Sequence, residues 1–335
     1  MSKWYLDEGN NSDVVLWSKI RLARNMADAP FPNRMSREIK KSVTKKIYAT
    51  VKSSSLANEF DMIHLDELSK AKRMSYVEKR LISKEHAFSA ENSGSCFMLS
   101  KDEDVSIMIC EEDHIRINSF EAGMNLESAY DRANRIDDIF IHSMNLAFSK
   151  ELGFLTASPI NLGTGLKASF ALHLPALRSK NAIYKLSSMV AKLGLSLREL
   201  YPDAAGDIYI LSNQVSLGIS EKGAMDNITA ICSQIVKQER AEREELKENI
   251  EFEDKIYRTL GILKSARKLD LAEFLNSLSL VRLGIADGYF DIEYSTISDM
   301  LFSLQNASLV ESAQADLSEL TCSKLRAQIV REKLE

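Results

Sequence analysis

The sequence predicts an α+β protein with a mixed amino-terminal part and an all-helical carboxy-terminal part. Segments at 105–109, 115–118, 169–174 and 207–217 are bounded by Gly, Pro, Asn or Asp, which is typical of strands. Apolar residues recur at helical spacing in 35–51 and 126–151. Residues 224–260 contain neither Gly nor Pro and keep an apolar stripe at helical spacing. We therefore expect the strands to lie in the first two thirds of the chain.

The last third is predicted to be helical throughout. Amphipathic stretches lie at 269–283, 295–309 and 316–334, with Gly284 and Gly288 as breaks between them. A chain of 335 residues is long enough for two domains of ordinary size. We expect a mixed catalytic domain at 1–240 and a helical domain at 241–335.

The bulk composition favours a globular protein and disfavours several function classes. Hydrophobic residues make up 45% of the chain and charged residues 27%, unlike disordered or membrane proteins. A net charge of −5 gives no general footprint for nucleic acid. No secretory signal and no apolar run of membrane-spanning length is visible, so no membrane association is expected. Four scattered cysteines form no C-x-x-C pair, which argues against zinc and disulfides and predicts a cytoplasmic location.

An acidic run follows the strand predicted at 105–109. Residues 110–116 read Cys-Glu-Glu-Asp-His-Ile-Arg, so three acids emerge where a half-buried strand ends. Acids in this place can face a ligand. A solvated charged turn is the alternative for any such run.

Cations occur in four places with apolar or Gly-containing surroundings. Lys19 and Arg21 alternate along an extended segment and so point to one face. Arg116 follows the acids, Lys167 follows the Gly-containing turn 161–165, and Arg198 lies in a fourth segment. Each cation alone is more often a surface residue. The turn is no P-loop, because it lacks the spacing G-x-x-x-x-G-K-[ST] and leads into a strand.

Together these segments resemble the catalytic domain of the phosphagen (guanidino) kinases, which include creatine and arginine kinases. The matching segments are SKIRLARN at 18–25, YVEKRLIS at 76–83, IMICEEDHIRI at 107–117, GFLTASPINLGTGLKASFALHLP at 153–175 and GDIYILSNQVSLGISE at 206–221. The resemblance covers about residues 12–240. The first motif begins at residue 18, without the preceding small helical domain of phosphagen kinases, and the spare length lies at the carboxy end. That layout is similar to the bacterial protein arginine kinases.

The resemblance implies an antiparallel sheet flanked by helices that binds ATP, with Mg²⁺ held mainly by phosphates and water and no dedicated protein ligands for a metal. It places the phosphate-binding cations at Lys19, Arg21, Arg116, Lys167 and Arg198. Lysine replaces the family's arginine at two of them, which keeps the charge but loses the bidentate fork. His86 matches a histidine near the nucleotide, and a structural histidine is the alternative. The implied ATP-binding residues also include Ser18, Ile20, Leu22, Ala168, Ser169, Phe170, Ala171, Glu199, Leu200, Tyr201, Pro202 and Asp203.

Phosphorylating a guanidinium needs carboxylates, because its pKa above about 12 makes it a poor nucleophile. Two acids can grip the planar group, aim one nitrogen and take up its proton. The resemblance assigns these roles to Glu112 and Asp203, with Glu111 and Asp113 supporting the loop. The family has glutamate at the position of Asp203, glycine at that of Pro202 and a reactive cysteine at that of Ser158, and its loop before Gly206 is about three residues longer. These departures bear on activity.

In the helical domain, residues 322–327 align with an R-D-x-x-R-A motif that binds phosphoarginine allosterically. Only Arg326 and Ala327 match, and a solvated helix residue is the alternative reading of Arg326. The resemblance also implies a homodimer, protein substrates bearing arginine, a small zinc-binding activator protein and an ATP-dependent protease as partners.

The function predicted is ATP-dependent phosphorylation of arginine side chains in proteins, which marks them for degradation. Two alternatives stay open. The altered loop around Asp203 is compatible with an adaptor that binds nucleotide and clients without turnover. A kinase for free arginine or another free guanidino compound is disfavoured by the missing domain that shapes the small-substrate pocket.

Overall fold

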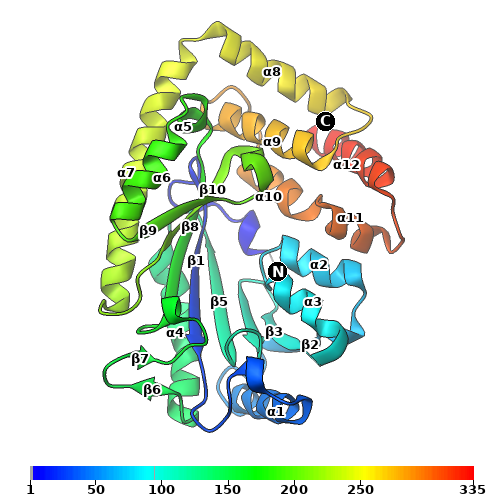
Figure 1. Ribbon diagram of the computed structural model, residues 1–335. Helices are drawn as coiled ribbons and strands as arrows, with labels where there is room; N and C mark the ends of the chain where they lie inside the picture. The colour runs from blue at the N-terminus through cyan, green and yellow to red at the C-terminus, as the bar shows by residue number, and fades with distance from the viewer. Residues whose placement is uncertain (1–2, 94) are drawn as a thin grey trace.

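The computed structural model describes residues 3–93 and 95–335, and its centre is one eight-stranded sheet in which every neighbouring pair is antiparallel (Figure 1). The strand order is β2-β3-β4-β5-β1-β8-β10-β9. The predicted antiparallel sheet is confirmed. The strands are β1 (Val15–Arg24), β2 (Phe60–His64), β3 (Cys96–Ser100), β4 (Val105–Ile109), β5 (Ile115–Ala122), β8 (Leu166–His173), β9 (Leu195–Glu199) and β10 (Ile208–Asn213), and β6 (Phe148–Ser149) and β7 (Gly153–Phe154) form a separate pair.

Helices surround the sheet and fill the carboxy-terminal third (Figure 1). Those before residue 200 are α1 (Arg37–Lys52), α2 (Lys70–Glu78), α3 (Lys84–Ser93), α4 (Leu126–Ser143), α5 (Pro175–Ser179) and α6 (Ile183–Lys192). Those after it are α7 (Glu221–Lys247), α8 (Ile250–Ser265), α9 (Leu271–Ala286), α10 (Tyr294–Ser303), α11 (Asn306–Ala313) and α12 (Glu319–Leu334). The predicted helical carboxy-terminal part is confirmed. Among the described residues no helix is long and apolar enough to cross a membrane.

The two faces of the sheet carry different side chains because successive residues of a strand point to opposite sides. One face is apolar, with Ile20, Leu22 and Phe170 fully buried in a core shared with α1, α4, α6 and α7. On the other face Trp17 and Phe120 belong to a second core with the carboxy-terminal helices. Part of this second face stays polar, and it carries the candidate site.

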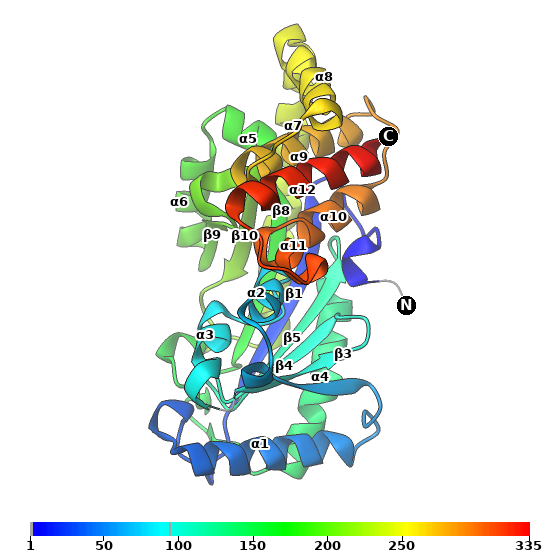
Figure 2. The same ribbon diagram turned by 90° about the vertical axis from the view of Figure 1, so that its right-hand side faces the viewer.

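The helical part packs directly on the sheet through a cluster of aromatic rings. Trp4 stacks on Phe120 at a centroid distance of 5.0 Å and meets Phe302 of α10 edge-on at 5.6 Å. Trp17 of β1 lies 5.5 Å from the same Phe302 ring. The side view shows α9 to α12 gathered beside the sheet, with α8 projecting at one end (Figure 2). The carboxy-terminal helices are thus continuous with the core of the sheet.

Several elements of the structure differ from the boundaries that were predicted for them. The helix predicted at 126–151 ends at Ser143, because the chain turns back to pair Met26 with Leu146. The helix predicted through residue 260 breaks at Asn249, whose side chain accepts hydrogen bonds from the first amides of α8. Residue 240, where we placed the domain boundary, lies inside α7. The helical stretch predicted at 295–309 contains α10 and the start of α11. Strands β1, β2, β3, β6, β7 and β9 fall outside the four segments that the pattern predicted, although an extended segment was expected around Lys19 and Arg21.

Candidate active site

All five predicted phosphate-binding cations lie on the polar face of the sheet. Arg21 of β1 pairs with Lys167 of β8, and Lys19 lies two residues earlier on the same side. Arg116 of β5 pairs with Ala23, which also shares a side with Arg21. Arg198 of β9 reaches this face through the cross-strand row that runs to β1. Paired residues of neighbouring strands point to the same side. The register therefore brings together charges from four strands.

The centre of this cationic face is a cavity of about 250 Å³. Lys19, Arg21 and Lys167 line it, as do Ser169 and Leu200 from the predicted ATP-binding segments. The further lining residues are Trp17, Arg80, Ile210 and Ser212. This cationic cavity combines an apolar floor with several positive groups, which suits a nucleotide phosphate chain.

Arg80 is a cavity residue that the sequence did not single out. It follows α2 in the left-handed conformation, with φ of 64°, and its guanidinium lies 5.2 Å from the ring of Tyr201. A side chain at the end of a helix can cross to a strand far away in sequence, so spacing alone did not reveal it. Arg80 lies inside the segment 76–83 that matches the guanidino kinases, but the resemblance was not used to assign it a role.

The cations of the cavity lower one another's pKa values. Burial, with repulsion from Arg21 and other cations, lowers the pKa of Lys19 to about 7. Burial, with repulsion from neighbouring cations, also lowers the pKa of Lys167 to about 8 and that of Arg21 to about 10. Desolvated like charges disfavour the charged form. A bound polyanion would reverse this effect, because it would favour the charged forms of these side chains.

The Gly-containing turn before β8 holds one of these cations. Gly165 has φ of 65°, and a Cβ atom there would lie 2.6 Å from the carbonyl oxygen of Ala23, so only glycine fits. At the start of the turn Asn161 accepts a hydrogen bond from Nη2 of Arg21 at 3.0 Å. The turn therefore packs closely on β1 and orients Arg21 while leading Lys167 into the sheet.

The acidic run forms the turn between β4 and β5, close to the cationic face. Cys110 takes a left-handed conformation with φ of 52°, and its amide donates to the carbonyl of His114 at 2.9 Å. Both Glu111 and Glu112 form ion pairs with Arg116. Glu112 remains partly exposed, with 41% of its side chain accessible. The turn thus presents one accessible carboxylate beside Arg116, a predicted phosphate-binding residue.

Asp113 belongs to the support of this turn. It is fully buried, and its Oδ1 accepts hydrogen bonds from Nδ2 of Asn25 at 2.7 Å and from the amide of Ala157 at 2.8 Å. Asn25 in turn accepts from the amide of His114 at 2.9 Å. These contacts join β1, the acidic turn and the loop that carries Ser158.

The structure places Asp203 away from the cationic cavity. It lies in the loop Pro202–Asp207 between β9 and β10 with φ of 55°, and lines a separate hollow with Arg178 and Glu199. Nη2 of Arg178 donates to the backbone oxygen of Asp203 at 3.2 Å, and Glu199 accepts from the amide of Ala204 at 3.1 Å. The two proposed carboxylates, Glu112 and Asp203, therefore do not line one common cavity.

Several residues of the predicted ATP-binding segments point elsewhere. Ser18 is buried and donates to the carbonyl of Gly123 at 2.6 Å. Tyr201 is buried and accepts from Gln305 of the helical part at 3.1 Å, while Pro202 is exposed at the start of its loop. Strand alternation sends every second residue to the opposite face, so the apolar core takes Ile20, Leu22, Ala168 and Phe170. Ala171 shares the row of Trp17 and is fully buried.

His86 and Arg326 have contacts of a structural kind. His86 is fully buried with Nε2 3.0 Å from the carbonyl of Cys96, and burial lowers its pKa to about 4. Arg326 is 1% exposed and donates to the carbonyl oxygens of Leu304 and Leu269, each at 2.8 Å. The solvated position considered for Arg326 is wrong, because the guanidinium fills its donors inside the helical part. These contacts give no support to a phosphoarginine site at Arg326.

Sequence comparisons match both parts of the chain. The pattern described as "ATP:guanido phosphotransferase, C-terminal catalytic domain" matches residues 41–242, and that of the "Protein-arginine kinase McsB C-terminal domain" matches residues 249–335. The protein-arginine kinase of Clostridium novyi is 39% identical over all of this chain and 99% of its own length. That of Clostridium kluyveri is 41% identical, again over 100% and 99%.

Solved structures share the fold of the sheet. The duplicated taurocyamine kinase of Schistosoma mansoni superposes with a TM-score of 0.61 at 24% identity, over 70% of this chain and 34% of that one. A lombricine kinase superposes with a TM-score of 0.60 at 22% identity, over 72% and 71%. At these identities the likeness establishes the architecture, and the function must be argued from the site.

Proposed function

The chain belongs to the ATP:guanido phosphotransferase family and, over its full length, to the protein-arginine kinases, and from this we propose that it transfers the γ-phosphoryl group of ATP to arginine side chains of proteins. The observation that carries the proposal is the cationic cavity beside the acidic turn. On one face of the sheet the cationic cavity suits a polyphosphate, and the adjacent acidic turn presents the carboxylate of Glu112.

ATP would bind with its phosphates against the cavity residues Lys19, Arg21, Arg80 and Lys167. Arg116 and Arg198 would contribute from the same face of the sheet. Mg²⁺ would be held by the phosphates and water, and its charge would add to that of the protein cations. Among the described residues no group of three or more His, Cys, Asp or Glu side chains is arranged to hold a metal ion. Phosphoryl transfer depends mainly on positioning and electrostatic stabilisation, which fixed cations on a rigid sheet supply.

Glu112 would bind the guanidinium of the acceptor and take its proton as the N–P bond forms. In the structure its carboxylate binds a guanidinium, that of Arg116. We propose that phosphate draws Arg116 toward the cationic cavity and frees Glu112 for the substrate. Asp203 would be the second carboxylate, which requires its loop to move toward Glu112 when both substrates bind, because the two acids line different hollows here.

The finer assignments of partners follow from the same membership. We propose that the protein acts as a cytoplasmic homodimer, that a small zinc-binding protein activates it, and that the phosphoarginine mark directs clients to an ATP-dependent protease. The full-length likeness to protein-arginine kinases favours this reading over a nucleotide-binding adaptor and over a kinase for free guanidino compounds.

The test is formation of acid-labile phosphoarginine by the purified protein with MgATP and an arginine-rich protein. We expect the wild type to form it and Glu112→Ala to be inactive. Glu127→Ala removes an exposed carboxylate from α4, on the opposite side of the sheet, and should keep full activity. Phosphorylation that persists in Glu112→Ala would exclude this residue. Efficient transfer to free arginine and none to protein would point to the phosphagen kinases instead.

A further inference from the structure

The loop that carries Asp203 has an unfavourable backbone conformation. Asp203 and Ala204 have φ of 55° and 52°, and Gly206 and Asp207 have φ of 78° and 53°. Glycine takes such values freely, whereas in other residues the Cβ atom crowds the following carbonyl oxygen. A segment with three non-glycine residues in this region persists only where its surroundings hold it. The contacts around the loop therefore determine where Asp203 lies.

Some of these contacts come from the sheet domain itself. Nη1 of Arg178, on α5, donates to the carbonyl of Ala204 at 2.8 Å and also contacts Oδ1 of Asp207 at 2.6 Å. Glu199 accepts from the amide of Ala204. Arg178 and Glu199 thus hold the first half of the loop, and Arg178 also holds its last residue.

The second half of the loop is also held by the helical part. Oδ1 of Asn276, on α9, accepts a hydrogen bond from the amide of Gly206 at 3.1 Å. Three residues further along α9, Ser279 donates its hydroxyl hydrogen to Oδ2 of Asp207. Residues at this spacing share one side of a helix. One side of α9 therefore grips two consecutive residues of the loop.

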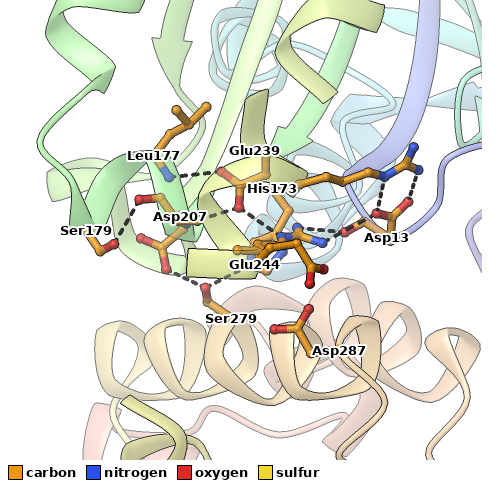
Figure 3. Close-up of polar contacts among 12 residues, drawn as sticks. Asp13, His173, Leu177, Ser179, Asp207, Glu239, Glu244, Ser279 and Asp287 are labelled. Carbon is orange, nitrogen blue, oxygen red and sulfur yellow. Dashed lines mark hydrogen bonds and ion pairs between the residues drawn. The ribbon is translucent and has the colours of Figure 1, made fainter. Parts of the chain in front are cut away.

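The hydrogen bond from Ser279 to Asp207 is buried, and its contacts determine which atom donates and which accepts. His173 of β8 places Nε2 at 2.8 Å from the Ser279 oxygen, and all three side chains converge in the close-up (Figure 3). Because the Ser279 hydrogen goes to Asp207, the nitrogen of His173 must be the donor. Burial lowers the pKa of His173 well below its usual value and keeps it neutral. A row of oriented hydrogen bonds thus joins β8, α9 and the loop.

We propose that the helical domain takes part in catalysis by placing Asp203, and that Asn276 and Ser279 are the positioning residues on α9. This inference rests on the proposed function of Asp203 as the second carboxylate. Asp203 must move toward Glu112 for transfer, and α9 would direct this movement, because a shift of α9 is transmitted to the loop through the amide of Gly206 and the carboxylate of Asp207. The cations that line the cavity, Lys19, Arg21, Arg80 and Lys167, have no part in these contacts, so nucleotide binding should be independent of them.

A matched pair at Asn276 provides the test, because this side chain is exposed and its replacement leaves the core intact. Asn276→Leu removes the acceptor of the Gly206 amide, while Asn276→Asp retains one. Ser279→Ala removes the second contact. Gln328→Ala on α12 is the control, since this exposed side chain donates a hydrogen bond to Glu332 on the same helix. The measurements are the rate of phosphoarginine formation on a protein substrate, the affinity for MgATP and the thermal unfolding temperature.

We expect Asn276→Leu and Ser279→Ala to lower kcat by about tenfold or more, because misplacement of a reacting group by a fraction of an ångström already costs that much. Their affinity for MgATP should stay within about twofold of the wild type, whereas Asn276→Asp and Gln328→Ala should keep the wild-type rate. Unchanged kcat in the first two variants would overturn the proposal. So would an equal loss of MgATP affinity, which would indicate general damage.

Asp203→Ala separates this inference from its premise. If that variant keeps the wild-type rate, the role of Asp203 fails and the proposed positioning fails with it. If Asp203→Ala is inactive while Asn276→Leu and Ser279→Ala are fully active, the role of Asp203 stands and only the coupling through α9 is refuted.

Discussion

Glu112 and Arg116 form an ion pair across the turn between β4 and β5, so a proposed substrate-binding carboxylate and a proposed phosphate-binding cation neutralise each other. The pair is half exposed on the Glu112 side, where solvent weakens it. An ion pair of this kind is easily exchanged for stronger contacts. Phosphate can replace Glu112 as the partner of Arg116, and a substrate guanidinium can replace Arg116 as the partner of Glu112.

This exchange predicts opposite effects of Glu112→Gln on catalysis and on nucleotide binding. The amide keeps the shape of the side chain but can neither attract a guanidinium nor take up its proton, so phosphoarginine formation should fall by about 100-fold or more. Without the Glu112 carboxylate, one anion fewer competes with phosphate for Arg116, so the affinity for MgATP should rise. Single-turnover kinetics and calorimetric titration measure the two effects. Weaker MgATP binding in this variant would contradict the exchange.

The pKa values of the cavity lysines predict that nucleotide binding depends on pH. Lys19 and Lys167 have pKa values of about 7 and about 8 in the free protein, and bound phosphate must raise both. Binding therefore takes up protons above pH 7, and affinity should fall as the pH rises from about 7 to 9. Titration in buffers of different ionisation enthalpy measures this uptake. Replacing both lysines by arginine should remove most of it, and uptake unaffected by that change would place the protons elsewhere.

Four strands of the sheet could be predicted from the sequence pattern, because they depend on short-range regularities, whereas the antiparallel arrangement and the full set of five cations were implied by the resemblance to the guanidino kinases. Alternation along β1 was enough to put Lys19 and Arg21 on one side. Which other residues meet them in the cavity depends on tertiary packing. Arg80 reaches the cavity from the end of α2, and no spacing rule links it to β1. The hollow that holds Asp203 exists because Arg178 and α9 fix a strained loop, and neither contact has a local sequence signal.

In the helical part, the buried contacts of Arg326 likewise have no local sequence signal. These contacts predict that the residue contributes to stability. Its guanidinium satisfies the carbonyl oxygens of Leu304 and Leu269 through two buried hydrogen bonds. Arg326→Met should leave both acceptors unsatisfied and destabilise the protein by about 2–4 kcal/mol, since each buried group without a partner costs about 1–3 kcal/mol. Thermal unfolding measures the loss. Lys324→Ala, at an exposed position of the same helix, should unfold like the wild type.

Arg80 allows backbone strain to be separated from ligand binding. Its φ of 64° is unfavourable for any residue with a Cβ atom, and its guanidinium lines the cationic cavity. Arg80→Ala and Arg80→Gly both remove the charge, so both should weaken MgATP binding to the same extent. Only glycine relieves the backbone, so Arg80→Gly should be more stable than Arg80→Ala by about 1 kcal/mol. Equal stability of the two variants, measured by denaturant unfolding, would show that the strain is absent. Unchanged MgATP affinity in both would remove Arg80 from the nucleotide site, so the pair tests both roles.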